Sequence, residues 1–277
     1  MRTTKLPSGE EVPVLGQGTW GMGEDPNSRQ NEIDALRFGL DNGMMLIDTA
    51  EMYGDGAAEE LVGKAILGRR NKAFLVSKVL PHNASRSGTI EACEQSLRRL
   101  ETDHIDLYLL HWRSQVPLAE TLAAFEELVR AGKIRHWGVS NLDLADMVEL
   151  VGLHGGPAVA TDQVLYNLMR RGIEYDLLPW CEQHNIPVMA YSPLEQNRLL
   201  GDRELRRIAG NYSATPAQIA LAWVLRNDRI IAVPKAGTPE HVKQNSIALD
   251  IALSRDDLAA LDRAFAPPTS KRPLEMI

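Results

Sequence analysis

The segment IDLYLLHWRSQVPLAETLAAFEELVRAGKIRHWGV, residues 105–139, contains two short apolar runs separated by one amphipathic stretch. The runs, Ile105–Leu110 and Ile134–Val139, have the length of buried strands, and Leu118–Ala131 has the spacing of a helix with one apolar face. Gly132 follows that stretch at a position where helices commonly end. A strand, a helix and a second strand in this order predict a βαβ unit with parallel strands.

The same alternation runs through the rest of the chain. Because no segment is left over as a second domain, we expect residues 1–277 to form one α/β domain, a closed (β/α)₈ TIM barrel. The other predicted strands are Val14–Gln17, Met44–Ile47, Ala73–Val76, Ala158–Gln163, Ile186–Ala190 and Ile230–Val233. The other predicted helices are Arg29–Asn42, Ala57–Leu67, Arg86–Leu100, Leu142–Leu153, Glu174–His184 and Pro239–Ala248.

Three further segments lie outside the eightfold pattern. Residues 3–14 contain a Pro-Ser-Gly-Glu turn and predict an N-terminal hairpin that caps the barrel bottom. Two extra C-terminal helices are expected, Thr215–Arg226, with Pro216 near its first turn, and Ser254–Phe265. A Pro-containing tail, residues 266–277, closes the chain.

Composition excludes several classes of protein. Thirty Lys and Arg against 37 Asp and Glu give a net charge of −7, which argues against nucleic acid or an anionic membrane as a partner. No apolar run approaches the ~18 residues of a membrane span, and the N-terminus lacks the apolar core of a signal peptide. Two distant cysteines, Cys93 and Cys181, suit the reducing cytoplasm, and no histidine has metal-ligand spacing. We therefore expect a cytoplasmic enzyme without a metal.

Polar side chains recur at the carboxyl ends of the predicted strands. In a (β/α)₈ barrel these ends carry the active site, so the side chains should meet at one mouth. Taken singly, each would more often be a surface or ion-pair residue, but recurrence across seven strands favours a site. The set is Asp48, Lys78, His111, Ser140, Asn141, Gln163, Tyr191 and Lys235.

The motifs that contain these residues resemble those of the aldo-keto reductases over essentially the whole chain. The resemblance implies a barrel that binds NADPH, with NADH possible, and reduces aldehydes or ketones to alcohols. The matching motifs are Asp48-Thr49-Ala50-Glu51-Met52-Tyr53-Gly54, Ser77-Lys78-Val79, Leu110-His111-Trp112, Gly138-Val139-Ser140-Asn141, Gln163, Tyr191-Ser192-Pro193-Leu194 and Ile231-Ala232-Val233-Pro234-Lys235.

The resemblance also implies a role for each catalytic residue. Tyr53 would give a proton to the carbonyl oxygen while the nicotinamide gives a hydride to the carbon. Lys78 would lower the pKa of the Tyr53 phenol, and Asp48 would hold the Lys78 ammonium. His111 would hydrogen-bond and polarise the carbonyl.

For the cofactor, the resemblance implies that Ser140, Asn141 and Gln163 bind the nicotinamide carboxamide and that Tyr191 stacks on the ring. Residues Ser192, Pro193 and Leu194 belong to the same cofactor-binding set, as do Lys235 at the 2′-phosphate and Asn245 near the adenine. The chain departs from NADPH-specific members at Ala236, His241 and Gln244, where Ser, Arg and Glu are usual. Since a neutral imidazole cannot grip phosphate as a guanidinium does, NADPH preference rests mainly on Lys235, and a contact by His241 would make it pH-dependent.

Several alternatives stay open at this point. Ser140 and Asn141 could merely cap the next helix. Gly16-Gln17-Gly18-Thr19-Trp20-Gly21 matches a Rossmann fingerprint, but a loop follows it where that fingerprint requires a helix. A short-chain dehydrogenase would need Tyr-x-x-x-Lys, which is missing, and a glycosidase would need two carboxylates, of which the strand ends offer only Asp48. A non-catalytic NADPH-sensing subunit with the same fold is the remaining alternative.

The substrate is indicated by the loops around the mouth. Trp20 and Trp112 are expected to wall the substrate pocket, while residues 112–117 and the tail after Phe265 offer little bulk. The pocket should therefore be open and suited to small aldehydes. The chain resembles bacterial family members that reduce methylglyoxal and related 2-oxoaldehydes, including the run Leu177–Cys181. A small carbonyl compound is the expected partner, and the protein is expected to be a monomer.

Overall fold

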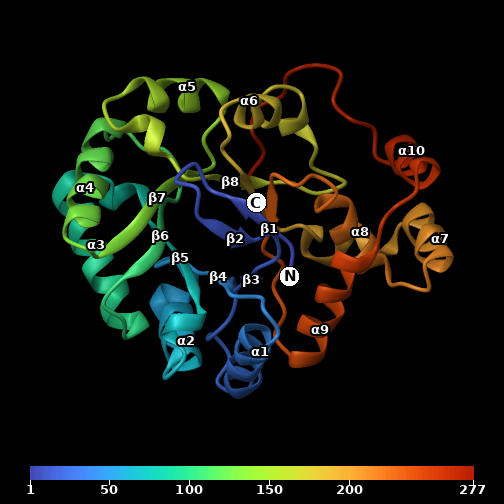
Figure 1. Cartoon of the computed structure of the whole chain (residues 1–277), viewed down its shortest axis with the longest axis horizontal. Coiled ribbons are helices and arrows are strands. Elements are labelled where there is room, and N and C mark those ends of the chain that lie inside the picture. The colour runs from blue at the N-terminus through green and yellow to red at the C-terminus, as the bar shows by residue number, and fades with distance from the viewer.

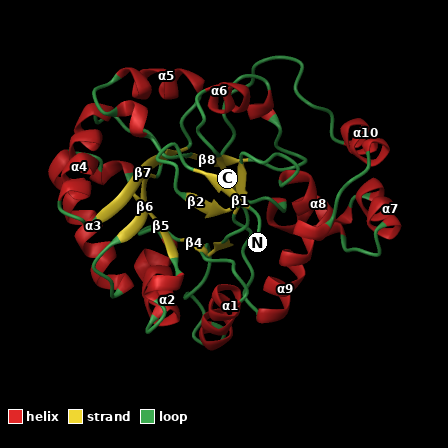
Figure 2. Ribbon diagram, in the orientation of Figure 1, coloured by secondary structure: helices red, strands yellow, loops and turns green.

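The computed structural model describes residues 1–277, in which eight parallel strands form a ring surrounded by helices (Figures 1 and 2). Strands neighbour one another in chain order from β3 to β10. Parallel bridges from Leu15 to Ala232 and from Gly18 to Lys235 close the ring, so the predicted barrel is confirmed. The strands are β3 (Gln17–Gly18), β4 (Leu46–Asp48), β5 (Phe74–Val79), β6 (Ile105–Leu110), β7 (Ile134–Ser140), β8 (Asp162–Leu165), β9 (Val188–Tyr191) and β10 (Ile230–Ala232).

All of the predicted helices are present, with ends within a few residues of those expected. Gly132 follows α4 with φ +69°, the left-handed conformation that ends a helix and that glycine adopts without strain. The helices are α1 (Arg29–Asp41), α2 (Ala57–Ile66), α3 (Arg86–Leu100), α4 (Leu118–Arg130), α5 (Leu144–Gly152), α6 (Leu177–Gln183), α7 (Arg203–Asn211), α8 (Pro216–Val224), α9 (Pro239–Ile247) and α10 (Arg255–Ala264).

Helix α7 is an addition that the sequence did not predict. Its residues, RELRRIAGN, are mostly polar, and only Leu205, Ile208 and Ala209 are buried. These three residues lie at i, i+3 and i+4, the spacing of one helix face, and this face packs on α8 and α10. Figure 1 places α7 and α10 outside the ring, next to α8.

The boundary between β7 and α5 resolves one alternative. Helix α5 begins at Leu144, and the Asp143 carboxylate caps it by accepting a hydrogen bond from the backbone N–H of Asp146 at 3.0 Å. The interpretation of Ser140 and Asn141 as helix caps is therefore wrong, because neither side chain bonds the first turn of α5. The Rossmann-like glycines are also a coincidental match, because α1 begins only at Arg29.

The N-terminal hairpin caps the barrel bottom as predicted. Strands β1 (Thr3–Lys5) and β2 (Glu11–Pro13) are antiparallel. Leu6 and Val12 pack in one apolar cluster with barrel residues such as Leu46 and Leu107. This cluster fills the barrel interior from below, so the opposite, carboxyl end of the strands is the end open to ligands.

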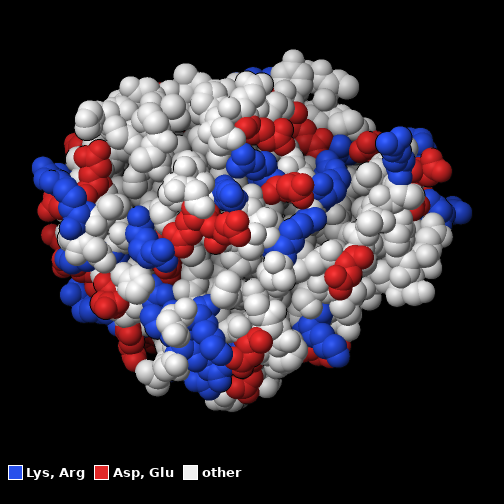
Figure 3. All heavy atoms as spheres, viewed as in Figure 1, with Lys and Arg blue, Asp and Glu red and all other residues white.

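The surface carries charges of both signs. On the face shown in Figure 3, acidic and basic side chains are interspersed and form no extended basic patch. None of the helices is long and apolar enough to cross a lipid bilayer.

Of the predicted extra helices, α8 begins with a capping box between Thr215 and Gln218, and α10 is capped by Ser254.

Candidate active site

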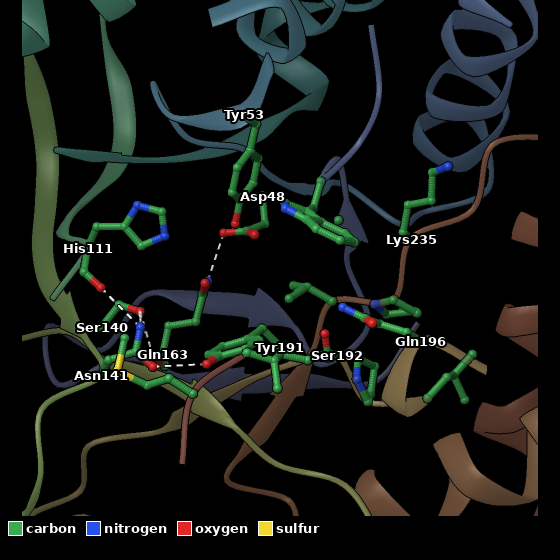
Figure 4. Close-up of a pocket in the computed structure, with 18 of the residues that line it drawn as sticks. Asp48, Tyr53, His111, Ser140, Asn141, Gln163, Tyr191, Ser192, Gln196 and Lys235 are labelled. Atoms are coloured by element: carbon green, nitrogen blue, oxygen red, sulfur yellow. Dashed lines mark hydrogen bonds between the residues drawn. The ribbon is translucent and has the colours of Figure 1, made fainter. Parts of the chain in front are cut away.

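The barrel mouth brings together the strand-end residues Asp48, Lys78 and His111 and the Tyr53 that the family resemblance implied. Figure 4 shows Asp48, Tyr53 and His111 there. Asp48 is the last residue of β4, Lys78 is the fifth of the six in β5, and His111 follows β6. Tyr53 begins a short 3-10 turn after β4. The neighbouring parallel strands β4, β5 and β6 place these side chains side by side, as the sequence predicted.

The Lys78 ammonium is completely buried and uses all three of its hydrogen-bond donors. It lies 2.8 Å from Asp48 Oδ1, 2.9 Å from the carbonyl oxygen of Thr49 and 3.2 Å from the Tyr53 hydroxyl. Burying an ammonium is costly unless its charge is paired and its protons are bonded, and here both conditions are met. Lys78 is therefore held as a cation that points one proton at the Tyr53 oxygen.

The acidity of Tyr53 differs from the sequence expectation. Burial raises the pKa of the Tyr53 phenol, and the Lys78 ammonium opposes this rise without reversing it, while the Asp48 charge adds to it. Lys78 therefore acts on the pKa of the phenol in the expected direction, but removal from water outweighs the effect of one cation. Tyr53 is consequently protonated at neutral pH, which is the state a proton donor requires.

His111 is the neutral member of the group. Burial, with the Lys78 cation as a second cause, lowers the pKa of the His111 imidazole to about 3. Its Nδ1 is buried and has no hydrogen-bond partner, and its ring lies 6.0 Å from the Tyr53 ring, edge to face. Neutral imidazole and protonated phenol together offer hydrogen bonds to one small polar group placed between them.

The predicted nicotinamide residues form the facing wall. The Tyr191 hydroxyl donates to Asn141 Oδ1 at 3.1 Å, and Asn141 Nδ2 donates to the His111 carbonyl oxygen at 3.1 Å. Ser140 Oγ donates to the Gln163 carbonyl oxygen at 2.7 Å. Asn141 has φ +57°, so its amide is turned into the mouth at the cost of a left-handed backbone.

These two walls enclose a cavity of about 330 Å³. Trp20 and Trp112 line it as predicted, with Trp20 56% exposed at the rim. Gln196 and Asn197 also line the cavity. The sequence did not point to them because they lie in a turn after β9 and not at a strand end. The predicted lining residues are Asp48, Tyr53, His111, Ser140, Asn141, Gln163, Tyr191, Ser192, Pro193, Leu194 and Lys235.

The predicted adenosine-phosphate residues lie at and beyond the edge of this cavity, on and before α9. Lys235 lines its edge, with no carboxylate within salt-bridge distance of its ammonium. His241 is exposed in the first turn of α9, which Thr238 caps. Ala236 and Asn245 are buried. Gln244 Nε2 donates to Glu240 at 2.7 Å, and its Oε1 accepts from Gln218.

The C-terminal tail corrects the expectation of a fully open pocket. Met276 and Ile277 line the cavity, although the tail was expected to add little bulk. Arg170 holds the tail, since its guanidinium lies 2.7 Å from Glu275 and 3.0 Å from the buried Glu195. The tail has no periodic apolar spacing, and its position depends on these ion pairs between residues far apart in the chain. The local sequence pattern therefore could not predict it.

The residues present fit a nicotinamide dinucleotide. The cavity combines an aromatic ring (Tyr191) with amide donors and acceptors (Asn141 and Gln163), the groups that would hold a planar ring bearing a carboxamide. The unpaired Lys235 ammonium, at the cavity edge before the capped N-terminus of α9, suits a phosphate.

Comparisons with known proteins agree with this geometry. A model of the aldo/keto reductase family matches residues 14–266. Methylglyoxal reductase YeaE of Escherichia coli K12 is 54% identical over 96% of this chain and 95% of YeaE. A Klebsiella pneumoniae aldo-keto reductase crystallised with NADPH is 53% identical, with a TM-score of 0.98 over 100% of this chain and 99% of that one. The NADH-specific methylglyoxal reductase of E. coli K12 is 33% identical over 91% of this chain and 94% of its own length.

The chain belongs to the aldo/keto reductase family. It is an oxidoreductase of the carbonyl-reducing class, whose cofactor is a nicotinamide dinucleotide. The alternative of a non-catalytic sensing subunit finds no support in these relatives.

Proposed function

We propose that the chain reduces methylglyoxal and related small 2-oxoaldehydes to hydroxy compounds with NADPH. The observation that carries the proposal is the buried Tyr53–Lys78–Asp48 set at a cavity wall, in a chain 54% identical to a methylglyoxal reductase. Such a set places a proton donor beside a cavity that has room for a small carbonyl compound and a nicotinamide ring.

Each catalytic residue has one task in this proposal. The reduced nicotinamide, when bound, supplies a hydride to the carbonyl carbon. Tyr53 gives its hydroxyl proton to the carbonyl oxygen, so that C=O becomes CH–OH, and solvent later reprotonates the phenolate. Lys78 stabilises that phenolate through its 3.2 Å contact, and Asp48 keeps Lys78 charged and in place.

His111 orients the carbonyl. Because its imidazole is neutral, it donates one N–H to the carbonyl oxygen without competing with Tyr53 as an acid. Tyr53 and His111 then hold the same oxygen from two sides, which fixes the carbonyl carbon over the site of the nicotinamide.

For the cofactor, we propose that Ser140, Asn141 and Gln163 bind the carboxamide and that Tyr191 stacks on the ring. Residues 192–194 line the neighbouring part of the cavity and would contact the same molecule. Lys235 meets the 2′-phosphate, with Ala236, His241, Gln244 and Asn245 completing the adenosine site along α9.

The proposal also covers the domain organisation, the location in the cell and the partners of the protein. Residues 1–277 act as a single domain, supported by one ring of strands and the hairpin that plugs it. The two free, buried cysteines suit a cytoplasmic protein. A monomer that binds no nucleic acid is consistent with an active site built entirely from one chain and with a net charge of −7.

The test is the loss of reduced-nicotinamide absorbance with purified protein and methylglyoxal, using NADPH and NADH in parallel. We expect rapid decay with NADPH and a higher kcat/KM for methylglyoxal than for glucose or a bulky ketone. Decay with NADH alone would contradict the role of Lys235. A preference for the bulky ketone would contradict the substrate class while leaving the reaction class intact.

A further inference from the structure

One side chain reaches straight across the barrel mouth. Gln163 Nε2 on β8 donates a hydrogen bond to Asp48 Oδ1 on β4 at 2.7 Å (Figure 4). In the closed ring, β8 stands four strands from β4 in either direction, so this contact spans the barrel's diameter. Gln163 is 1% exposed and Asp48 3%, so water does not compete for the contact.

The chemistry of the partners fixes which end of the Gln163 amide faces Asp48. An ionised carboxylate only accepts hydrogen bonds, and Asp48 is ion-paired with Lys78, so the amide nitrogen must face it. The amide oxygen is left on the cavity side, where it accepts no hydrogen bond from the protein. Gln163 therefore offers one acceptor to an occupant of the cavity while its donor holds Asp48.

Asp48 Oδ1 is shared between two donors. It accepts from Gln163 at 2.7 Å and from Lys78 at 2.8 Å, and Lys78 in turn donates to Tyr53 at 3.2 Å. Gln163 is thus joined to the Tyr53 hydroxyl by an unbroken set of buried hydrogen bonds. Such sets act as a unit, because each bond constrains the next donor.

We propose that Gln163 is a positioning residue for the proton donor, joining the carboxamide-binding wall to the Asp48–Lys78–Tyr53 set. This inference rests on the proposed roles of those three residues. An occupant whose N–H bonds the Gln163 oxygen holds the amide in the orientation that fixes Asp48. Binding of the cofactor carboxamide and alignment of the Tyr53 proton donor are then linked through the same Gln163 side chain.

The electrostatics favour the same arrangement. The charged and titratable side chains around Tyr53 are Asp48, Lys78, His111 and Tyr191. Tyr53 and Tyr191 are close enough for the charge of one phenolate to raise the pKa of the other. Asp48 and Lys78 act on the Tyr53 hydroxyl in opposite directions. A donor that partly offsets the Asp48 charge reduces its unfavourable effect on the Tyr53 phenolate, so the stabilising effect of Lys78 is less opposed.

The first experiment separates cofactor binding from the chemical step. Gln163→Met keeps the volume and removes the donor. In NADPH-loaded enzyme we expect the single-turnover rate at saturating cofactor to fall about tenfold, the effect of losing a hydrogen bond to a charged group. NADPH affinity, measured by fluorescence quenching, is recorded separately. Asp162→Asn is the matched control, since it alters the preceding β8 residue on the outer face and should leave the rate unchanged.

A double-mutant cycle tests the route through Asp48. If Gln163 acts through that carboxylate, Gln163→Met in an Asp48→Asn background should cost less than about threefold in the same single-turnover rate. An equal loss in both backgrounds would overturn the proposal, as would an unchanged rate in the single variant. The assays use 4-nitrobenzaldehyde alongside methylglyoxal, so an error in the proposed substrate does not affect the outcome.

A second variant covers the case in which Gln163→Met does not fold. Gln163→Glu is isosteric, and its carboxyl group can donate to Asp48 only when protonated. We expect its single-turnover rate to rise as pH falls from 8 to 5, while the wild-type rate stays level. A slow rate that is level with pH would assign Gln163 a purely structural or cofactor-binding role and overturn the proposal.

Discussion

The two ends of the barrel use similar residues in opposite ways. At the hairpin end, buried Asp106 accepts hydrogen bonds from Arg70 at 2.8 Å and Arg135 at 2.9 Å. Glu10 of the hairpin pairs with the same Arg135, and also with His136 at 2.6 Å. Here each carboxylate has an arginine beside it.

At the mouth, a polar atom lacks a partner. His111 Nδ1 is buried and has no hydrogen-bond partner. Non-glycine residues with positive φ cluster there as well, at Asn141, Ser192 and Gln196. Unsatisfied polar atoms and strained backbone cost stability, and such costs gather at functional sites. The comparison indicates that one end stabilises the barrel while the other performs the chemistry.

The largest effect should follow from the proton donor. We expect Tyr53→Phe to lower kcat by about 10²–10⁴-fold, since it removes the only proton given to the carbonyl oxygen. NADPH affinity should stay nearly unchanged. The matched control is Tyr108→Phe, which removes the hydroxyl of another fully buried tyrosine, on β6. Near-normal turnover in Tyr53→Phe would contradict its assignment.

The next effect concerns the neutral histidine. Because burial lowers the pKa of His111 to about 3, its protonation is complete only below that value, and kcat/KM should be level from pH 5 to 8. His111→Gln should cost about 10²–10³-fold in kcat at every pH in this range, as loss of a polarising donor does. A break in the wild-type profile near pH 6.5 that disappears in His111→Gln would refute this picture.

A stability gain is expected at the outer face of β8. Asp162 is fully buried without a well-formed hydrogen bond to either carboxyl oxygen, and burial raises its pKa well above the ordinary value. The Leu142 backbone N–H opposes this rise, while Asp146 and Asp143 add to it. A pKa raised in the folded state costs stability as pH rises above the unfolded value and costs nothing below it. Asp162→Asn should therefore stabilise by about 1–3 kcal/mol at pH 7. Urea unfolding at pH 7 and pH 4 should show the gain shrinking at the lower pH.

The smallest effect lies at the hairpin end. Glu10→Gln removes the charge that pairs with Arg135 and His136, whose side chains are partly exposed. We expect a loss of about 1 kcal/mol or less, because exposed ion pairs are screened by water, and an unchanged kcat/KM. A change in catalysis from this variant would show that the two ends are coupled.

The sequence predicted the barrel well because each βα unit carries its own local pattern. Apolar runs and amphipathic stretches alternate from β3 to α9, and Gly132 marks a helix end through its own backbone freedom. Helix α7 escaped prediction because its apolar face consists of only Leu205, Ile208 and Ala209 in a short, mostly polar stretch. Strand β8 begins at Asp162, later than expected, because residues 156–158 form a 3-10 turn.

For the site, the sequence predicted which residues meet but not how they are connected. Strand ends converge by topology, so Asp48, Lys78 and His111 could be grouped from their positions alone. The Gln163–Asp48 contact joins residues 115 positions apart and depends on side-chain reach across the ring. The placement of Met276 depends on an ion pair 105 positions long between Arg170 and Glu275, which no local pattern encodes.

The position of Ile277 has a practical consequence for anyone handling the protein. An affinity tag, fluorescent fusion or surface linker attached after this residue would start at the wall of the substrate cavity. It would compete with substrate or displace Met276 from the cavity wall. The measured kcat and KM would then differ from those of the untagged enzyme. The hairpin at Thr3–Lys5 lies at the closed end of the barrel, so the N-terminus is the safe point of attachment.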